Sequence, residues 1–311
     1  LSTPARAKPT NLLLVGVPGC GKTMLAGRMA SILPQVSFAE SLAITQIHSV
    51  AGLTRPSEGI VTRRPFRAPH HTATAAAMFG TRHLQPGEVS LAHNGVLFLD
   101  EFPEFNRNIR EQLRGPLEDR QITLSRAQGC VTLPAGFSLI AAMNPCPCGF
   151  SGHPTRACSC LPSGIDRYRA RLSGPLLDRI DLQVWVQPID ANALYCEKKG
   201  ESSRTVRSRV EAARQVQRDR FRDMNIHANA ELTGDQIETA TQATGQARRL
   251  LRDILQKHNA SGRAWDRTLK VARTIADLEG ADTVLPDHIL EASSYRIPLL
   301  SDPSDSLAVV S

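Results

Sequence analysis

Residues 16–23 combine glycine, lysine and threonine at a spacing that suits the binding of a polyphosphate. They read Gly-Val-Pro-Gly-Cys-Gly-Lys-Thr, match G-x-x-x-x-G-K-[ST], and directly follow the apolar run Leu12–Val15. Backbone N–H groups of such a turn point inward and cradle nucleotide phosphates. We expect Lys22 to neutralise the β- and γ-phosphate oxygens and the Thr23 hydroxyl to ligate Mg²⁺. The predicted nucleotide contacts are Gly16, Val17, Pro18, Gly19, Cys20, Gly21, Lys22, Thr23 and Met24.

An ordinary glycine turn between a strand and a helix is the alternative interpretation of this octet. Two features of the surrounding sequence favour nucleotide binding. Leu12–Val15 is typical of a short buried strand, and Met24–Ala30 has the apolar spacing of a helix. A strand, a glycine turn and a helix start are the elements that such a site requires.

A second apolar run, Val96–Leu99, ends in the acidic pair Asp100-Glu101. Four apolar residues in a row are typical of a buried parallel strand, whose C-terminal end lies at the sheet edge where ligands bind. We expect Asp100 to hold the magnesium shell and Glu101 to polarise the water that attacks the γ-phosphate. A core strand that ends in a solvated acidic turn is the alternative.

A third apolar strand is expected over residues 137–144, and its terminal Asn144 is suited to orienting the attacking water or contacting the γ-phosphate. A strand-capping amide in a turn is the alternative. Between the last two strands, Ile122–Arg126 and Val131–Pro134 flank a glycine turn and predict a β-hairpin. Arg126, close to the hairpin tip, is a candidate contact to a polyanion, although an exposed arginine in a turn needs no function.

Four cysteines form the pattern C-x-C-x₉-C-x-C within a loop that is rich in glycine and proline. Four thiolates meet the tetrahedral requirement of a structural Zn²⁺. His153 and His93 remain possible substitute ligands, and four reduced, unligated thiols are the alternative. Adjacent His70 and His71 lack an evident third ligand. The predicted zinc ligands are Cys146, Cys148, Cys158 and Cys160.

The composition limits the class of protein without identifying its function. The 311 residues carry a net charge of +7, which suits a nucleic-acid partner but is also common without one. No apolar run approaches the ~18 residues of a membrane span, and the polar start is no signal peptide. Seven cysteines therefore indicate a reducing, cytoplasmic setting with metal or free thiols. The initial Leu1 leads us to expect a piece of a longer protein.

Several long strings in the chain resemble the magnesium-chelatase-like AAA+ ATPases typified by bacterial YifB and ComM. The resemblance covers about residues 11–297, and the Lon-like N-terminal domain that such proteins usually carry is missing. It implies an α/β P-loop NTPase core, a parallel sheet flanked by helices, with a C-terminal α-helical lid. The strings span residues 64–72, 86–101, 116–118, 139–149, 169–181 and 270–277.

The resemblance also implies a role for each matching residue. Lys22 and Thr23 fall on Walker A, Asp100 and Glu101 on Walker B, and Asn144 on sensor 1. Arg179 falls on the arginine finger that reaches the γ-phosphate of a neighbouring subunit, although a salt bridge to a nearby aspartate is the alternative. We assign the sensor 2 arginine to Arg263. Arg267, which lies one helical turn further on, is the alternative. Family members usually have Pro and Thr where this chain has Val17 and Cys20.

By resemblance, the basic string from Arg63 to His71 belongs to an insertion in helix 2 that projects toward a central pore. It has the periodicity of neither helix nor strand. Further on, Ser203–Met224 is expected to form a helix with a solvated, arginine-rich face, and DNA contact is the alternative. The spans 233–258, 263–279 and 286–295 are expected to be the lid helices. The expected parts are a linker remnant (1–10), the core (11–190, including the cysteine loop 146–160), a linker helix (191–230), the lid (231–297) and a flexible tail (298–311).

The leading hypothesis is a Mg²⁺-dependent ATPase that assembles as a homo-oligomer, expected to be a hexamer, and moves on or remodels DNA. The resemblance implies helicase or branch-migration activity in natural transformation or recombination, on single-stranded or branched DNA. A magnesium-chelatase motor subunit and a protein-remodelling ATPase are the alternatives. The expected cofactors are ATP, Mg²⁺ and a structural Zn²⁺, and no membrane partner is expected.

Overall fold

The computed structural model describes residues 10–54, 59–126, 129–188, 200–224, 226–258, 260 and 262–296. The chain divides into two compact units, which we describe separately. The sheet unit comprises residues 11–180 and 184–200, and the helical unit comprises 1–10, 181–183 and 201–311. The expected tail, residues 298–311, and most of the expected linker remnant lie outside the described residues. No helix among the described residues is both long and apolar enough to cross a membrane.

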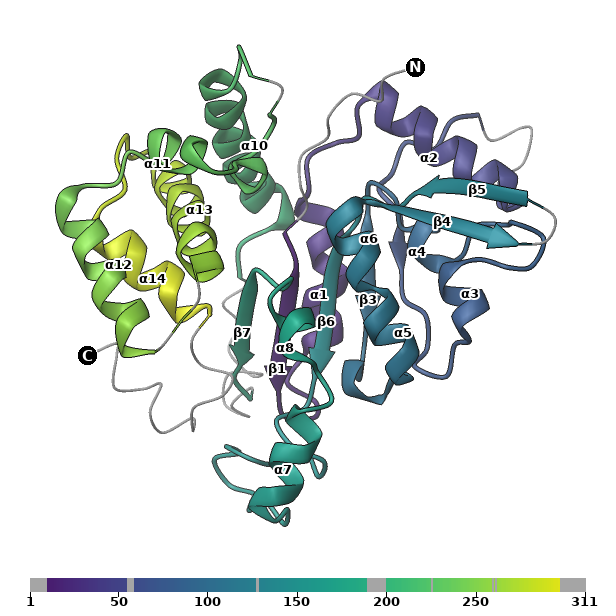
Figure 1. Ribbon diagram of the computed structural model, residues 1–311, viewed down its shortest axis with the longest axis horizontal. Coiled ribbons are helices and arrows are strands. Elements are labelled where there is room, and N and C mark those ends of the chain that lie inside the picture. The colour runs from purple at the N-terminus through teal and green to yellow at the C-terminus, as the bar shows by residue number, and fades with distance from the viewer. Residues whose placement is uncertain are drawn as a thin grey trace. The chain divides into compact units, whose positions relative to one another are not determined.

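The sheet unit is built on five strands in the order β2-β3-β6-β1-β7 (Figure 1). The pairs β1–β6, β3–β6 and β2–β3 are all parallel. The non-sequential order places strands from distant parts of the chain side by side and brings their C-terminal ends to one edge. The strands are β1 (Leu12–Gly16), β2 (Phe66–Arg67), β3 (Val96–Leu99), β6 (Ser138–Met143) and β7 (Leu182–Val186).

The strands β1, β3 and β6 are buried on both faces of the sheet, which explains why they read as continuous apolar runs. Leu14, Phe98 and Ile140 pack with Ala26 of α1 in one cluster. Residues of alternating position, such as Leu13 and Leu97, are fully buried on the opposite face. The helices of the unit are α1 (Lys22–Ile32), α2 (Phe38–Val50), α3 (Ala75–Phe79), α4 (Glu88–Leu91), η1 (Phe102–Glu104), α5 (Arg107–Gln112), α6 (Arg114–Asp119), α7 (Pro162–Arg169) and α8 (Gly174–Leu177).

The predicted hairpin is present as a separate two-stranded sheet of β4 (Gln121–Arg126) and β5 (Gly129–Pro134). Its base is closed by a 2.7 Å hydrogen bond from Ala135 N to Arg120 O. One of its buried side chains, Leu124, lies against Gly80, where an added Cβ would come within 2.5 Å of Leu124 Cδ1. Gly80 begins the turn between α3 and α4, so the hairpin docks on that turn.

The basic string around residue 66 differs from its expected structure. Phe66 and Arg67 form β2, the edge strand, in parallel register with Val96 and Leu97 of β3. The sequence shows the periodicity of neither helix nor strand here and so did not predict this strand, while the placement of the string in a pore-facing insertion stays a prediction. A two-residue strand is too short to display alternation in the sequence, and backbone pairing with a neighbour stabilises it instead.

The helical unit contains α10 (Ser203–Arg220), η2 (Asn229–Glu231), α11 (Asp235–Thr241), α12 (Gly245–Lys257), α13 (Gly262–Glu279) and α14 (Pro286–Ser294). The single helix expected over 233–258 is wrong, because the structure has two helices there. Gln242 adopts a positive φ of 48° and ends α11, Ala243 forms a bridge with Val284, and Thr244 caps α12 through Ala247 N. The apolar faces of α11–α14 enclose one core around Leu251, Leu269 and Ile289.

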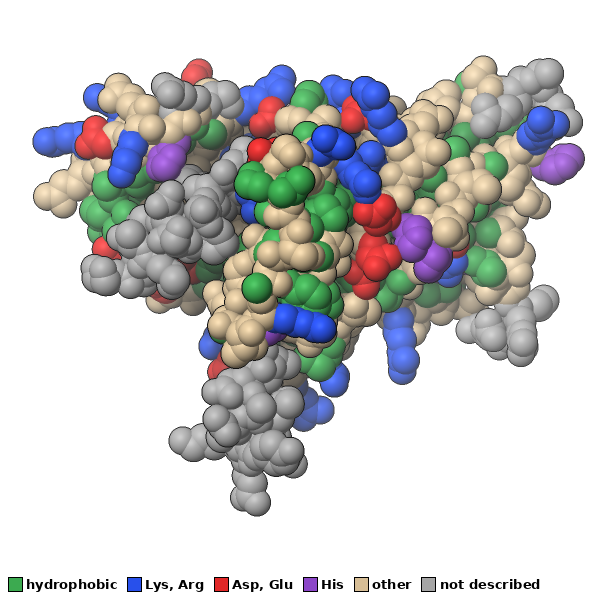
Figure 2. Space-filling view, turned by 90° about the horizontal axis from the view of Figure 1, so that it is seen from below, with side chains coloured by type: hydrophobic (Ala, Val, Ile, Leu, Met, Phe, Trp, Pro, Cys, Tyr) green, Lys and Arg blue, Asp and Glu red, His purple; other side chains and the backbone are tan. Residues whose placement is uncertain are grey.

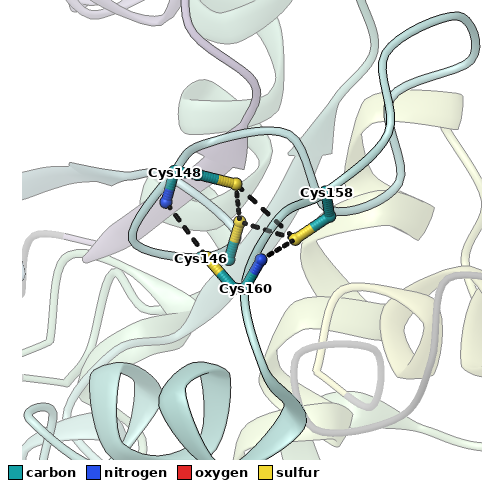
Figure 3. Close-up of side chains that lie close together, drawn as sticks. All are labelled: Cys146, Cys148, Cys158 and Cys160. Atoms are coloured by element: carbon teal, nitrogen blue, oxygen red, sulfur yellow. Dashed lines mark hydrogen bonds between the residues drawn. The ribbon is translucent and has the colours of Figure 1, made fainter.

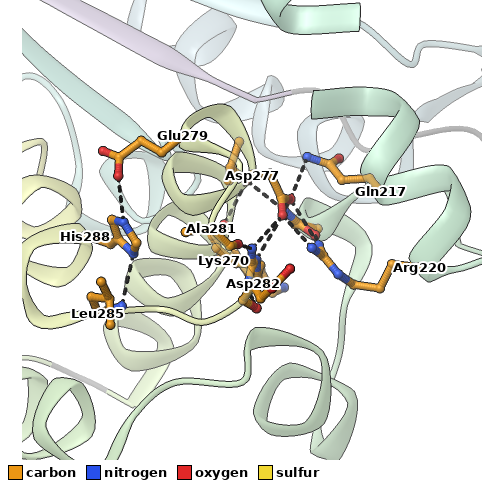
Figure 4. A network of polar contacts seen from close by, with 12 residues as sticks. Gln217, Arg220, Lys270, Asp277, Glu279, Ala281, Asp282, Leu285 and His288 are labelled. Atoms are coloured by element: carbon orange, nitrogen blue, oxygen red, sulfur yellow. Dashed lines mark hydrogen bonds and ion pairs between the residues drawn. The ribbon is translucent and has the colours of Figure 1, made fainter. Parts of the chain in front are cut away.

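A buried polar network joins α10 to α13 within this unit (Figure 4). Asp277 has a fully buried side chain and accepts hydrogen bonds from Arg220, Asn229 and Arg273 at 2.5–3.0 Å. Burial opposes the ionisation of Asp277, but the hydrogen bonds from Arg220 and Asn229 and the charge of Arg273 outweigh it and lower its pKa. The network therefore holds an aspartate and two guanidinium groups in their charged forms inside the unit.

Candidate nucleotide-binding site

The phosphate loop connects the end of β1 to the start of α1. Gly19 and Gly21 have φ angles of 80° and 89°, a conformation that glycine adopts without the steric cost of a Cβ. Gly16 is required for a different reason, since a Cβ there would lie 2.6 Å from Val186 O. Helix α1 then begins at Lys22, so its free N–H groups face the loop. The local sequence thus produces an anion-binding turn.

Lys22 lies at the centre of this loop and is 8% exposed. Its Nζ donates to the carbonyl oxygens of Gly16 and Val17 at 2.7 and 3.0 Å, and to Asn144 Oδ1 at 3.3 Å. The predicted Walker A lysine and sensor 1 asparagine therefore lie in direct contact, although 122 residues separate them. The ammonium group is partly desolvated, which strengthens its interaction with an incoming phosphate.

Thr23 and Asp100 also meet at the same sheet edge. Thr23 Oγ1 donates to Asp100 Oδ2 at 2.9 Å, and Asp100 Oδ1 accepts from Glu101 N at 2.9 Å. A hydroxyl and a carboxylate oxygen are hard donors of the kind that Mg²⁺ prefers alongside water and phosphate oxygens. The pair fits a magnesium ion shared with a nucleotide.

Glu101 follows β3 in the left-handed conformation, with φ 51° and ψ 43°. Its carboxylate is half-exposed and lies 3.0 Å from His71 Nδ1. The His71 ring meets Phe105 edge-on and lies beside the His70 ring at a tilt of 34°, with ring centroids 4.1 Å apart. The structure therefore gives His71 a contact to the predicted catalytic glutamate, which the sequence did not indicate.

Asn144 is supported from behind by α7. The hydroxyl of Tyr168, a buried residue, bonds to the backbone of Asn144, and burial raises the pKa of Tyr168 to about 12. Arg169 Nε approaches Pro145 O at 3.5 Å. Helix α7 thus fixes the backbone of the residue that contacts Lys22. Neither residue carried a recognisable signal in the sequence.

Arg179, the predicted arginine finger, is not brought into this group of side chains. Arg179 forms an ion pair with Glu118, and its Nη1 donates to Pro175 O at 2.7 Å. Its side chain is 16% exposed. Arg263 is exposed and Arg267 half-buried on α13, in the helical unit.

Two arginines of the basic string are engaged within the sheet unit. Arg64 donates to Pro34 O and Asn94 O and pairs with Glu40 at 3.1 Å, while Arg67 pairs with Glu88 at 2.6 Å. On the face drawn in Figure 2, Lys and Arg side chains lie in several separate groups rather than in one continuous band. The positive net charge alone therefore does not define a polyanion-binding surface. Arg126 ends β4, and its side chain lies outside the described residues.

The four predicted zinc ligands converge in the loop that follows β6 (Figure 3). Their sulfur atoms all lie within 4.8 Å of one another, and three of the pairs are 3.4–3.6 Å apart. Four sulfurs placed ~2.3 Å from a tetrahedral zinc ion would lie ~3.8 Å apart. The cluster therefore has the size and the donor set of a closed zinc site. His153 does not join it, because its Nδ1 accepts from the backbone of Thr155 and Arg156.

The environments of the cluster thiols differ. Hydrogen bonding from the backbone of Phe150 lowers the pKa of Cys148 to about 5, whereas burial raises the pKa of Cys146. The cluster thus contains one thiol that ionises readily, and a divalent cation would supply the charge needed to deprotonate the others. Outside it, the buried Cys20 has its Sγ 3.8 Å from Lys22 Nζ, and Cys130 is exposed on β5.

Comparison with known proteins agrees with the architecture of the chain. Residues 5–194 match the family model of magnesium chelatase subunit ChlI, and residues 200–296 match the model of its C-terminal region. The chain is 47% identical over 290 residues to YifB of Salmonella typhimurium, covering 92% of this chain and 56% of that protein. It is 42% identical over 299 residues to the competence protein ComM of Haemophilus influenzae, covering 94% of this chain and 57% of that protein.

A more distant similarity links the chain to the DNA helicase MCM8 of Bos taurus. The two are 27% identical over 179 residues, which cover 58% of this chain and 18% of that protein. The chain spans a little over half the length of YifB and ComM. The family models, in contrast, match almost the whole described chain.

Proposed function

Because this chain belongs to the magnesium chelatase subunit ChlI family, we propose that it is the ATPase portion of an oligomeric AAA+ motor that acts on DNA. The observation that carries the proposal is the meeting of Lys22, Thr23, Asp100 and Asn144 at one sheet edge. These are the side chains that a Mg²⁺-dependent hydrolysis of ATP requires. Lys22 and Thr23 begin α1, Asp100 follows β3 and Asn144 follows β6. We assign residues 11–190 to the ATPase core, 191–230 to a linker and 231–297 to the lid.

In the proposed reaction, Lys22 exchanges its contacts with the loop carbonyls for contacts with the β- and γ-phosphates. Thr23 and Asp100 hold Mg²⁺, which neutralises phosphate charge when it is bound. Glu101 accepts a proton from the attacking water, and Asn144 orients that water or the γ-phosphate. The positions of these side chains favour an in-line attack, in which positioning and electrostatics supply the catalysis.

A neighbouring subunit completes this site in our proposal. Arg179 would leave Glu118 and contact the γ-phosphate of the adjacent subunit, which makes hydrolysis depend on assembly. Sensor 2 is assigned to Arg263, with Arg267 as its competitor, and a hexamer is the proposed assembly. To reach the γ-phosphate of the adjacent subunit, Arg179 would give up its ion pair with Glu118, whose side chain is 61% exposed, and its hydrogen bond to Pro175 O.

The four-cysteine cluster is proposed to hold a structural Zn²⁺. Its geometry supports this assignment, because all four sulfur atoms lie within 4.8 Å of one another and small shifts would give the ~3.8 Å separations of a tetrahedral site. The free thiols suit a reducing compartment, and we assign the protein to the cytoplasm. Elemental analysis of protein purified without chelator tests the metal. About one equivalent of zinc is expected, and less than half an equivalent would reject the site.

DNA is the proposed substrate, on the strength of two relatives. MCM8 is named as a DNA helicase, which is the direct link to DNA, and ComM is named as a competence protein. We propose helicase or branch-migration activity on single-stranded or branched DNA, with the β4–β5 hairpin and Arg126 near its tip as the contact to phosphates. A magnesium-chelatase motor subunit, which the family name supports, and a protein-remodelling ATPase are the alternatives.

An ATPase assay with and without single-stranded DNA at low salt separates these functions. Stimulation of hydrolysis by DNA is expected, and it should fall as salt concentration rises. The Lys22→Ala variant is the matched control and should show no nucleotide binding. If DNA stimulates hydrolysis in neither the full-length nor the truncated protein, the proposed action on DNA is excluded. The proposed ATPase activity would then remain.

A further inference from the structure

The cysteine loop, residues 146–160, touches the phosphate loop directly. Gly149 lies so close to Pro18 that an added Cβ would come within 2.7 Å of Pro18 Cγ and 2.8 Å of Cδ. Gly149 also has a φ of 85°, and its N–H closes a turn onto Cys146 O at 3.0 Å. The first two cysteines therefore form part of a turn whose outer surface packs against the third residue of the phosphate loop.

The same turn is joined to the residue that contacts Lys22. Asn144 precedes Cys146 by two residues, and its Cγ lies 3.9 Å from the position of a Cβ on Gly149. Cys146 is fully buried beneath this turn, and its Sγ accepts from Ser151 N at 3.3 Å. The turn consequently has the phosphate loop on one side and the sulfur cluster on the other.

The other two cysteines come from the far end of the loop. Cys148 N donates to Cys160 Sγ, and Cys160 N donates to Cys158 Sγ, both at 3.4 Å. These contacts to sulfur are weak, so thiols alone hold the two ends of the loop together loosely. A metal bonded to all four sulfurs would cross-link the ends and remove most of the conformational freedom of the turn.

We propose that occupancy of the four-cysteine site by a thiolate-binding divalent cation, Zn²⁺, controls the nucleotide affinity of the phosphate loop. The inference rests on the ATP site and the zinc site proposed above. The bound metal fixes Gly149 against Pro18 and holds Asn144 beside Lys22, so the loop is already ordered when the nucleotide arrives. Loss of the metal releases this contact, and the nucleotide must then order the loop itself.

Thermodynamic reciprocity gives the inference a second consequence. If metal raises the affinity for nucleotide by some factor, nucleotide must raise the affinity for metal by the same factor. Coupling between two sites in one protein is typically at least about fivefold. A purely structural metal would alter the melting temperature but would change neither affinity in this paired manner.

The experiment measures both affinities on the purified chain. A fluorescent ADP analogue is titrated into zinc-loaded protein and into protein stripped with a chelator, and zinc affinity is measured against a chromogenic chelator with and without ADP. We expect nucleotide affinity to fall at least about fivefold on stripping, and zinc affinity to rise by the same factor with ADP. Cys158→Ser should reproduce the stripped protein. Cys130→Ser, which removes an exposed cysteine outside the cluster, should bind nucleotide like the parent.

A variant that leaves all four thiols in place tests the contact itself. Gly149→Ala introduces a methyl group against Pro18 and should weaken nucleotide binding while zinc content stays near one equivalent. Gly164→Ala in α7 is its control, because no atom lies within 4 Å of the added Cβ. If Gly149→Ala loses zinc, the nucleotide affinities of zinc-loaded and stripped parent protein still test the coupling between the two sites.

The outcomes separate this inference from the proposals on which it rests. Equal nucleotide affinity of loaded and stripped protein would overturn the coupling and leave the ATPase and the zinc site intact. Protein that binds nucleotide but contains no zinc would overturn the coupling together with the zinc site. Loaded protein that binds no nucleotide, like Lys22→Ala, would overturn the ATPase proposal as well.

Discussion

Replacing Asp277 by asparagine should strongly destabilise the helical unit. The substitution keeps the shape of the side chain and one acceptor oxygen but removes its charge. Arg273, which is 1% exposed, and Arg220 would then face each other without the carboxylate that compensates both. Breaking a buried ion pair by removing one partner typically costs about 3–5 kcal/mol, because a charge stays buried without compensation.

The expected size of the effect follows from the position of Asp277. Even the lower figure, about 3 kcal/mol, should lower the melting temperature of a unit of roughly 100 residues by about 12 °C or more. The lowered pKa of Asp277 adds a dependence on pH. Because its pKa is lower in the folded than in the unfolded state, its contribution is complete well above 3.8 and is lost as the pH falls through the folded-state value. The parent and Asp277→Asn should therefore differ most near neutral pH.

Thermal unfolding followed by circular dichroism measures this difference, with limited proteolysis identifying the unit that opens. Asp253→Asn on α12 is the matched control, since Asp253 is exposed and its replacement should change stability by at most ~0.5 kcal/mol. A melting temperature of Asp277→Asn within 2 °C of the parent at pH 7 would refute the argument. Because α13 also carries Arg263 and Arg267, the variant should impair hydrolysis wherever the unit is open.

Three further predictions concern the nucleotide site. Glu101→Gln should bind ATP with an affinity within about threefold of the parent, measured by equilibrium binding. Its turnover, measured by phosphate release, should fall at least about 100-fold. Turnover close to that of the parent would exclude Glu101 as the general base. His71→Ala should lower turnover up to about fivefold with unchanged nucleotide affinity, because a half-exposed ionic contact such as that between His71 and Glu101 is worth up to about 1 kcal/mol. His71→Gln should restore part of the turnover. Arg179→Ala should reduce turnover about 1,000-fold in the assembled protein, and normal hydrolysis would contradict its role as a finger.

The sequence predicted the elements of the core because their signals are local. The buried strands at residues 12–16, 96–99 and 138–143 read as apolar runs. The glycines of residues 16–21 indicate a turn whose backbone adopts positive φ angles. The parallel AAA+ architecture is confirmed by the strand order and by the family match. The zinc ligands, the general base and the arginine finger stay predictions.

The rest depended on contacts between distant residues, which no local pattern records. Edge strand β2 forms because Phe66 and Arg67 pair with β3, and His71 acquires its contact to Glu101 only once that pairing exists. Similarly, nothing near Gly149 in the sequence indicates Pro18 as its neighbour. The break at residues 242–244 was missed because the apolar spacing continues on both sides, while a backbone bridge to Val284 interrupts the helix.

The docking of the β4–β5 hairpin on the turn at Gly80 has a mechanical consequence. Since Leu124 leaves no room at Gly80, the hairpin and the turn form a stiff lever whose base is clamped at Arg120 and Ala135. A displacement of the hairpin would therefore be passed to the turn that joins α3 and α4. Helix α4 carries Glu88, which holds Arg67 of β2, four residues before His71. Force applied far from the phosphate loop thus has a short, rigid route to the residue that holds Glu101.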